Sequence, residues 1–332
     1  MTIQRIGVLG AGAWGTTLAI VARRAGREVL LWARREQQVR ALSSERENKL
    51  HLSGIKIDPA ITITNDIDAA LKADAVLVAL PAQHLREHLA APAWPPGVPA
   101  VICAKGIERG SLLSMPDVMI EIQPKAPLAM LSGPTFAGEV ARGKPGAIVI
   151  AAKDMALAED LAGAIATPEF RPYASDDLAG VALGGAVKNV LAIGCGIVVG
   201  RGLGENARAA LVTRGLAELA RLVDAAGGKR ETAMGLSGAG DLILTATSLQ
   251  SRNTSLGESL GRGRTLTEIL AQRRSVAEGV ESAAAVVALA AKYGVEMPIC
   301  ESVSAILAGG SIDEELRRLL ARPLKRESEA EN

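Results

Sequence analysis

The chain has 332 residues, which is long enough for two domains with separate cores. Its 37 lysines and arginines nearly cancel its 36 aspartates and glutamates, so no long-range field favours nucleic acid or an anionic membrane. Aromatic residues, at 2%, leave little surface for stacking bases. The N-terminal apolar run is too short for a signal peptide, and Cys103, Cys195 and Cys300 lie in apolar stretches, which predicts reduced thiols in a cytoplasmic protein.

The first predicted elements surround a glycine-rich turn. A short apolar strand at residues 5–9 precedes it, an apolar helix pattern follows it, and the turn reads Gly10-Ala11-Gly12-Ala13-Trp14-Gly15. This arrangement is typical of a dinucleotide-binding unit. Gly10 permits the tight turn, Gly12 lets a backbone amide approach the pyrophosphate, and Gly15 lets the helix pack closely on the strand. The free N–H groups of the helix N-terminus would face the anion.

The next strand, predicted at residues 28–32, bears on the choice of cofactor. NAD enzymes usually place a carboxylate after this strand, on the ribose 2′-hydroxyl, but here Arg34 and Arg35 follow it. An arginine there would bind a 2′-phosphate through charge-assisted hydrogen bonds. The alternative is a solvated basic pair at the start of a polar helix. We favour NADPH over NADH as the cofactor.

Further along the chain, strand and helix patterns alternate up to about residue 175, with strands predicted at 61–64, 75–80, 98–103, 126–131 and 147–151. Alternation of this kind is typical of a doubly wound α/β sheet. Beyond it the pattern is helical. We therefore predict a Rossmann-like doubly wound sheet at residues 1–176, followed by a mostly α-helical substrate and catalytic domain at residues 177–332.

Lys188 is the first candidate for chemistry. It lies in a predicted helix at residues 177–193, where Gly184, Gly185, Leu191 and Ala192 are its neighbours at helical spacing, so no carboxylate forms the usual ion pair. The glycines would leave room for a ligand, and partial burial would lower the pKa of the lysine toward the range useful for proton transfer. The alternative is an interior lysine whose ammonium reaches solvent.

Two segments beyond it could complete a site. Asp241 follows a glycine-rich stretch and could either face Lys188 or cap the next helix. Ser251, Arg252 and Asn253 offer a hydroxyl, a guanidinium and an amide suited to phosphate oxygens, although such a tripeptide is more often a polar loop.

Three residues follow predicted strands and would lie at the ligand-binding edge of the sheet: Lys105, Gly133 and Thr135. Each could equally belong to an ordinary turn. His84 and His88 are spaced like metal ligands on a helix, but no third ligand accompanies them, so we predict no metal site.

Further segments in a characteristic order accompany the glycine-rich turn: Lys105-Gly106, Ser132-Gly133-Pro134-Thr135-Phe136-Ala137, Gly184-Gly185-Ala186-Val187-Lys188-Asn189, Asn206-Ala207-Arg208-Ala209-Ala210-Leu211, Thr213-Arg214-Gly215-Leu216, Gly240-Asp241-Leu242, Ser251-Arg252-Asn253, Glu278-Gly279 and Gly294-Val295-Glu296-Met297-Pro298-Ile299. Together they span nearly the whole chain, and the set resembles the bacterial type of NAD(P)-dependent glycerol-3-phosphate dehydrogenase. It implies reduction of dihydroxyacetone phosphate by NAD(P)H to sn-glycerol 3-phosphate, for phospholipid synthesis.

The resemblance also implies roles for individual residues. Lys188 would be the catalytic acid, Asp241 would hold it in place, and Lys105 would belong to the same catalytic set. Residues expected to line the substrate site are Lys105, Gly133, Thr135, Lys188, Asp241, Ser251, Arg252 and Asn253. Positions expected to contact the cofactor, beyond the three glycines and Arg35, are Ala13, Trp14, Arg34, Lys105, Ala137, Arg252, Val276 and Glu278.

The sequence departs from the family pattern beside these positions. Alanine stands where the family often has a larger residue at Ala239, Ala246 and Ala277, and residues 48–53 lack the expected proline. Two alternative functions stay open: a related dehydrogenase with a helical-domain lysine acting on another keto or hydroxy acid, and a non-catalytic dinucleotide sensor. A homodimer is expected only because symmetric dimers are common.

Overall fold

The computed structural model describes residues 2–273 and 277–324. The chain divides into two units by its internal contacts. Unit 1 comprises Met1–Ala104 and Met115–Leu178, and unit 2 comprises Lys105–Ser114 and Ala179–Asn332. The boundary predicted at 176/177 assigned residues 105–114 to the first domain, whereas the contacts of this segment lie in unit 2.

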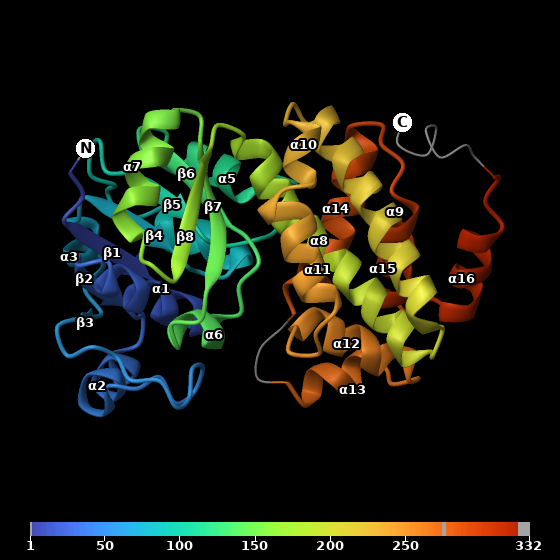
Figure 1. Ribbon diagram of the computed structural model, residues 1–332, viewed down its shortest axis with the longest axis horizontal. Coiled ribbons are helices and arrows are strands. Elements are labelled where there is room, and N and C mark those ends of the chain that lie inside the picture. Colours follow the sequence, from blue (N-terminus) through green and yellow to red (C-terminus); the bar gives the residue numbers. More distant parts are fainter. Residues whose placement is uncertain (1, 274–276, 325–332) are drawn as a thin grey trace. The chain divides into compact units, whose positions relative to one another are not determined.

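Unit 1 is built on a mixed β-sheet (Figure 1). Within the described residues its order is β3-β2-β1-β4-β5-β6-β7-β8. The strands are β1 (Arg5–Leu9), β2 (Glu28–Trp32), β3 (Thr62–Thr64), β4 (Ala75–Val78), β5 (Ala100–Ile102), β6 (Leu128–Ser132), β7 (Gly146–Ala152) and β8 (Phe170–Ser175). The order β3-β2-β1-β4-β5-β6, all parallel, is that of a Rossmann sheet.

The far edge of this sheet differs from a purely parallel arrangement. Strand β7 pairs antiparallel with β6 and parallel with β8. The sequence predicts β7 but misses β8, because β8 is an edge strand with exposed positions and a proline, Pro172. Proline and polar residues are tolerated at an edge and obscure the apolar pattern of a strand.

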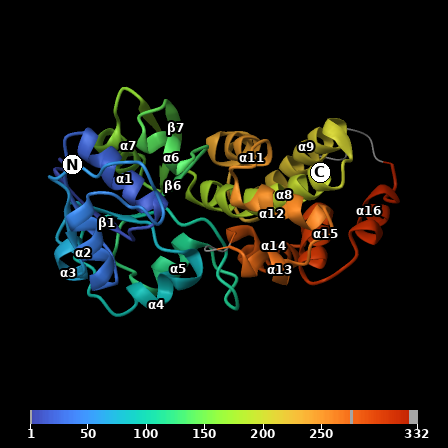
Figure 2. The same cartoon turned by 90° about the horizontal axis from the view of Figure 1, so that it is seen from below.

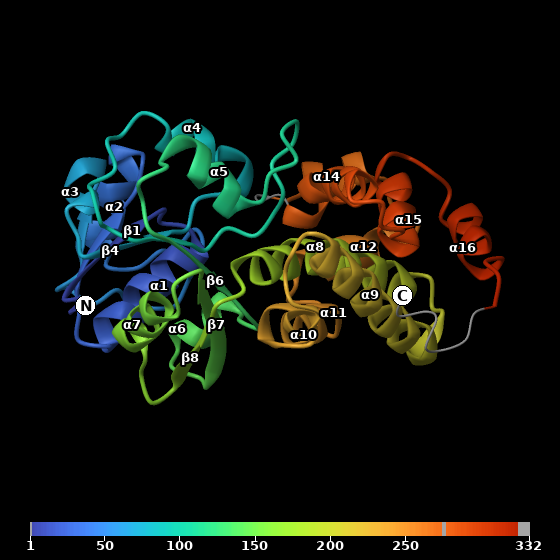
Figure 3. The ribbon, with the colours of Figure 1, turned by 90° about the horizontal axis from the view of Figure 1, so that it is seen from above.

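Helices cover both faces of the sheet. In Figures 2 and 3, α1, α6 and α7 lie together over one face, and α4 and α5 lie over the other. The helices of unit 1 are α1 (Ala13–Arg24), α2 (Glu36–Glu45), α3 (Ile67–Leu71), the 3₁₀ turn η1 (Ala82–His84), α4 (Leu85–Leu89), α5 (Met115–Ile122), α6 (Ala137–Ala141) and α7 (Met155–Ile165). The apolar side chains between sheet and helices form the core of this unit.

Unit 2 is helical and is organised around α8 (Leu178–Gly200), with α11 and α14 on opposite sides of it (Figures 2 and 3). The other elements are α9 (Gly204–Ala225), α10 (Arg230–Ala233), the π turn η2 (Leu236–Gly240), α11 (Asp241–Ala246), α12 (Arg252–Gly261), α13 (Leu266–Ala271), α14 (Glu278–Lys292), α15 (Pro298–Leu307) and α16 (Ile312–Leu320). By length and composition α8 could cross a membrane, but its apolar window is 100% buried, which is typical of a core helix.

Glycines let α8 and α12 approach each other closely. A Cβ atom on Gly196 would lie 2.1 Å from the Thr254 carbonyl oxygen, and one on Gly257 would lie 2.0 Å from the Ile193 carbonyl oxygen. These distances are far below van der Waals contact, so only glycine fits at either position. The close crossing fixes the start of α12 beside the middle of α8, where Lys188 and Asn189 lie.

Candidate active site

The glycine-rich turn of unit 1 forms a cradle for an anion. Gly10 has φ +109°, and a Cβ on Gly15 would lie 1.8 Å from the Gly10 carbonyl oxygen, so both positions require glycine. At Gly12, the N-cap of α1, a Cβ would meet nothing within 4 Å. No side chain caps the N-terminus of α1, and its first turn holds no acidic residue. The residues present therefore fit a dinucleotide pyrophosphate.

Two amide side chains that sequence reasoning missed hold this turn in place. Asn48, 3% exposed, donates from Nδ2 to the Ala11 carbonyl oxygen at 3.0 Å and to Thr16 Oγ1 at 2.8 Å. Gln38 Nε2 donates to the same carbonyl at 2.9 Å. No sequence motif placed Asn48 there, because its partners are 37 and 32 residues away in the chain.

We expect Asn48→Ala to raise the Kd for NADPH and to lower the free energy of unfolding by about 1–3 kcal/mol, because the buried partners lose a hydrogen bond. Titration calorimetry and urea unfolding would measure the two effects. Gln37→Ala, at an exposed position of the neighbouring helix, is the matched control and should leave both values unchanged. Equal cofactor affinity in Asn48→Ala and the control would contradict a role for Asn48 in shaping the turn.

The other predicted cofactor positions are placed as follows. Trp14 is half-buried and packs on the core of unit 1, and Arg34 and Arg35 are exposed after β2. Ala137 begins α6, and its carbonyl accepts a hydrogen bond from Thr17 Oγ1 of α1 at 3.1 Å. Lys105, Arg252 and Glu278 lie in unit 2, and Val276 lies outside the described residues.

The loop after β6 contains the predicted substrate residues of unit 1. Gly133 has φ +142°, and a Cβ there would lie 2.8 Å from the Ile148 Cα atom on β7, so the fold requires glycine at this position. Thr135 Oγ1 donates to the Gly133 carbonyl oxygen at 3.3 Å. The hydroxyl is thereby fixed at the carboxyl end of β6, the edge at which ligands bind in such sheets.

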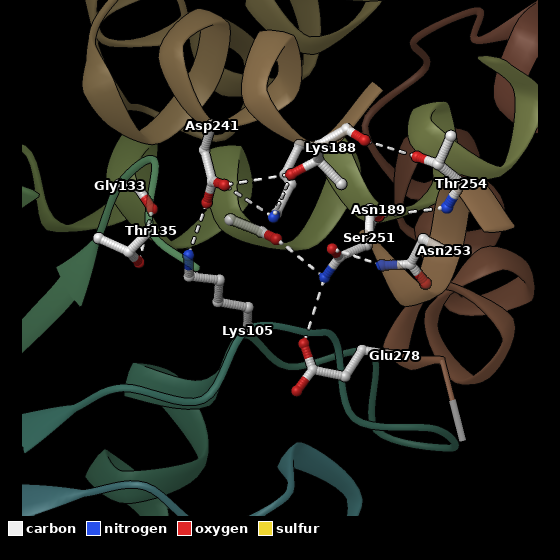
Figure 4. Close-up of polar contacts among 12 residues, drawn as sticks. Lys105, Gly133, Thr135, Lys188, Asn189, Asp241, Ser251, Asn253, Thr254 and Glu278 are labelled. Atoms are coloured by element: carbon white, nitrogen blue, oxygen red, sulfur yellow. Dashed lines mark hydrogen bonds and ion pairs between the residues drawn. The ribbon is translucent and has the colours of Figure 1, made fainter. Parts of the chain in front are cut away.

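Unit 2 brings two lysines and a carboxylate together (Figure 4). Lys188 Nζ donates to Asp241 Oδ1 at 2.8 Å and to Thr245 Oγ1 at 2.9 Å. Lys105 Nζ donates to the other carboxylate oxygen, Asp241 Oδ2, at 2.5 Å. Lys188 is 7% exposed and Asp241 is 2% exposed, so these charges are largely removed from water.

Burial and charge act in opposite directions on this cluster. Burial lowers the pKa of Lys188, and the charge of Lys105 lowers it further, against the attraction of Asp241. Burial alone would raise the pKa of Asp241, but the two lysines outweigh it and hold this pKa below its ordinary value. The result is an ionised carboxylate beside a lysine that gives up its proton more readily than a solvated one.

Of the two alternatives for Asp241, the structure excludes the helix cap: Asp241 is the first residue of α11, and its carboxylate faces Lys188 and accepts from both lysines. The interpretation of Gly184 is wrong. Gly184 leaves no room for a ligand: a Cβ there would lie 2.9 Å from the Ser237 carbonyl oxygen, so this glycine lets η2 pack against α8. That packing carries Asp241, the next residue after η2, to Lys188.

A second polar network adjoins the lysine cluster, and sequence reasoning missed its central residue, Asn189 (Figure 4). Asn189 Oδ1 accepts from Asn253 Nδ2 at 2.8 Å, and Asn189 Nδ2 donates to Glu278 Oε2 at 3.3 Å. Asn253 Oδ1 in turn accepts from the Gly279 amide at 3.0 Å. The network joins α8, α12 and α14 next to Lys188 and holds the start of α12 in place.

A glycine-rich dinucleotide cradle on the parallel strands of a Rossmann sheet, together with a buried lysine–carboxylate cluster able to deliver a proton, defines a nicotinamide-dependent oxidoreductase. Within residues 2–273 and 277–324, no three His, Cys, Asp or Glu side chains gather in a way that could hold a metal ion.

Comparison with known proteins identifies the family. Residues 5–158 match the model for the NAD-dependent glycerol-3-phosphate dehydrogenase N-terminus, and residues 177–316 match the model for its C-terminus. The chain belongs to this family.

Its relatives include a glycerol-3-phosphate dehydrogenase [NAD(P)+] of Rhodospirillum rubrum, 56% identical over 99% of this chain and 96% of the relative. Another, from Caulobacter vibrioides, is 54% identical over 99% of this chain and 100% of the relative. The solved glycerol-3-phosphate dehydrogenase of Coxiella burnetii superposes with a TM-score of 0.91 at 36% identity, covering 96% of this chain and 99% of the other.

Proposed function

We propose that this enzyme reduces dihydroxyacetone phosphate to sn-glycerol 3-phosphate with NADPH or NADH, and so supplies the backbone of glycerophospholipids. The observation that carries the proposal is the Lys188–Asp241–Lys105 cluster. It is supported by full-length relatives that are named glycerol-3-phosphate dehydrogenase [NAD(P)+]. When bound, the dinucleotide supplies the hydride to the carbonyl carbon.

In this proposal Lys188 supplies the proton. An ammonium has three N–H donors, and Lys188 directs two of them to Asp241 and Thr245. The third can bind the substrate carbonyl oxygen, stabilise the alkoxide that forms, and then transfer its proton to it. Asp241 stays ionised throughout and keeps both lysines oriented. In the reverse direction the neutral amine of Lys188 accepts the proton.

The structure at the start of α12 indicates different roles for the three residues predicted to bind the substrate phosphate. Ser251 Oγ accepts the Thr254 amide at 3.2 Å as the N-cap, and Asn253 is 7% exposed with both ends of its amide engaged. Arg252 is exposed. We therefore propose that Arg252 binds the substrate phosphate with the Ser251 hydroxyl, while Asn253 and Asn189, whose amide groups are engaged at both ends, hold the start of α12 against α8.

The direct test measures the loss of NADPH or NADH absorbance as each cofactor is oxidised. Dihydroxyacetone phosphate, pyruvate and ketopantoate are offered as substrates in separate assays. Oxidation that depends on dihydroxyacetone phosphate alone is expected. Oxidation with a keto acid instead would favour the related dehydrogenase. Tight cofactor binding without turnover on any of the three would favour the dinucleotide sensor.

Asp241→Asn is expected to lower the free energy of unfolding at neutral pH by roughly 3–5 kcal/mol, because an amide always presents an N–H group to one of the two lysines that bind the buried carboxylate. The pKa of Asp241 is lowered in the fold, so its contribution is present above its unfolded pKa and is lost as pH falls through the folded pKa. The difference between wild type and variant should therefore shrink below about pH 4.

Urea unfolding at pH 7 and in acid would measure this difference. Asp313→Asn is the matched control, since it breaks an exposed ion pair with Arg201 and should cost no more than about 1 kcal/mol. Equal stability of Asp241→Asn and the control at pH 7 would contradict the assignment of Asp241 as the counter-ion of both lysines.

We further propose that the enzyme acts in the cytoplasm as a homodimer. Cys103, Cys195 and Cys300 are buried thiols, none in a disulfide, which suits a reducing compartment. The dimer rests on the general frequency of symmetric pairs. Light scattering after size exclusion, giving twice the 34.3 kDa chain mass, would support it, and a monomer mass at working concentration would refute it.

A further inference from the structure

A cluster of titratable side chains lies beside the end of β2, outside the catalytic cluster. We name it the adenosine-side cluster: Arg34, His84, Glu87 and His88. The rings of His84 and His88 are 6.2 Å apart, and His84 Nδ1 lies 3.0 Å from Glu87 Oε2. His88 also meets the edge of Trp32, the last residue of β2, at a ring distance of 6.4 Å.

The place of this cluster determines what it can bind. In a Rossmann unit the residues just after β2 face the ribose 2′ position of the dinucleotide. Arg34 is the arginine whose charge acts on both Glu87 and His88. The ring contact of His88 with Trp32, together with the effect of the Arg34 charge on His88, therefore places α4 beside the position where NADPH and NADH differ.

We propose that the adenosine-side cluster selects between the two cofactors and makes the choice depend on pH. His88 and Arg34 bind the 2′-phosphate of NADPH, whereas Glu87, when released by His84, accepts the 2′-hydroxyl of NADH. This inference rests on the proposed cofactor site and adds its specificity-determining residues.

The charges of the cluster give the direction of the effect. Burial lowers the pKa of His88, and Arg34 and His84 lower it further against the pull of Glu87. The hydrogen bond from His84 lowers the pKa of Glu87, so the carboxylate is ionised. On α4, Arg86 is held by Glu121 of α5 at 2.7 Å and adds no free charge. Because its pKa is lowered, His88 gains its positive charge only as the pH becomes acidic, and this charge favours the phosphate.

The test measures Kd by titration calorimetry for NADPH and NADH between pH 5 and pH 7, the range in which a histidine with a lowered pKa gains its charge, in wild type and in the double variant His84→Gln, His88→Gln. The 2′-phosphate itself loses charge near pH 6, which opposes the effect, so the double variant is the reference. As pH falls, the ratio of the NADH Kd to the NADPH Kd is expected to rise in wild type. This rise should be about three- to fivefold larger than in the double variant, which is the effect typical of a partly solvated charge pair.

Three further measurements sharpen the outcome. Repeating the titration in buffers of different ionisation enthalpy should show more proton uptake with NADPH in wild type than in the double variant. Glu87→Gln should weaken NADH binding and strengthen NADPH binding, and Arg34→Gln should weaken NADPH binding more than the exposed control Arg40→Gln.

Parallel pH profiles in wild type and the double variant, with equal proton uptake, would overturn this inference and leave the cofactor site standing. Failure of the folded wild type to bind either cofactor would overturn the cofactor site itself.

Discussion

Replacement of Lys188 by alanine is expected to lower kcat by about 10²- to 10⁴-fold, the usual contribution of a positioned general acid, while the Kd for NADPH changes little. The reason is that Lys188 is held by Asp241 and Thr245 within unit 2, whereas the glycine-rich cradle belongs to unit 1. Steady-state kinetics with dihydroxyacetone phosphate and a separate cofactor titration would measure the two quantities.

Two controls separate chemistry from structure. Lys188→Arg keeps the positive charge but cannot release a proton, so its kcat should also be low. A small primary amine added to Lys188→Ala should restore part of the rate, which a merely misfolded site would not allow. Loss of NADPH binding with normal turnover per bound cofactor would contradict the role of Lys188.

Gly12→Val is expected to raise the Kd for NADPH at least about 100-fold while the apo protein folds normally, because a side chain would occupy the place of the pyrophosphate at the helix N-terminus. Gly12 has φ −79° and ψ −172°, an extended conformation that valine adopts readily, and a Cβ there meets nothing within 4 Å. Thermal melting of the apo protein and titration with NADPH would test both halves of the statement.

Gly15→Ala provides the contrast. Its Cβ would lie 1.8 Å from the Gly10 carbonyl oxygen, so this smaller substitution should damage the fold itself and lower the melting temperature. Normal NADPH affinity in Gly12→Val would mean that the pyrophosphate does not lie over the N-terminus of α1.

The parts predicted from the sequence are those encoded locally. The β1–turn–α1 unit, the change from mixed to helical structure and the exposed pair Arg34–Arg35 all follow from short-range patterns and agree with the structure. Lys188 stood out because helical spacing offers it no carboxylate neighbour, and the structure brings Asp241 to it from 53 residues away.

The parts that the sequence did not predict depend on distant segments. Asn48 and Asn189 look like ordinary polar residues until the Ala11 carbonyl and Asn253 are brought to them. Gly184 was misread because a glycine that admits a ligand and one that admits another backbone have the same sequence signature. The antiparallel pairing of β7 with β6 likewise depends on the path by which the chain returns to the sheet, and no local sequence pattern predicts that path.

Because residues 105–114 belong to unit 2, the helical unit is formed from two separate segments of the sequence. The chain places Lys105 on Asp241 and buries Ile107 in the helical core, and Arg109 pairs with Glu281 at 2.9 Å, before the chain returns to the sheet. A fragment that starts at residue 177 would therefore lack one of the two cations that neutralise Asp241. In a chimaera of two homologues joined at residue 177, Lys105 would come from one parent and its partner Asp241 from the other. Recombination between homologues should instead exchange residues 105–114 together with the C-terminal segment.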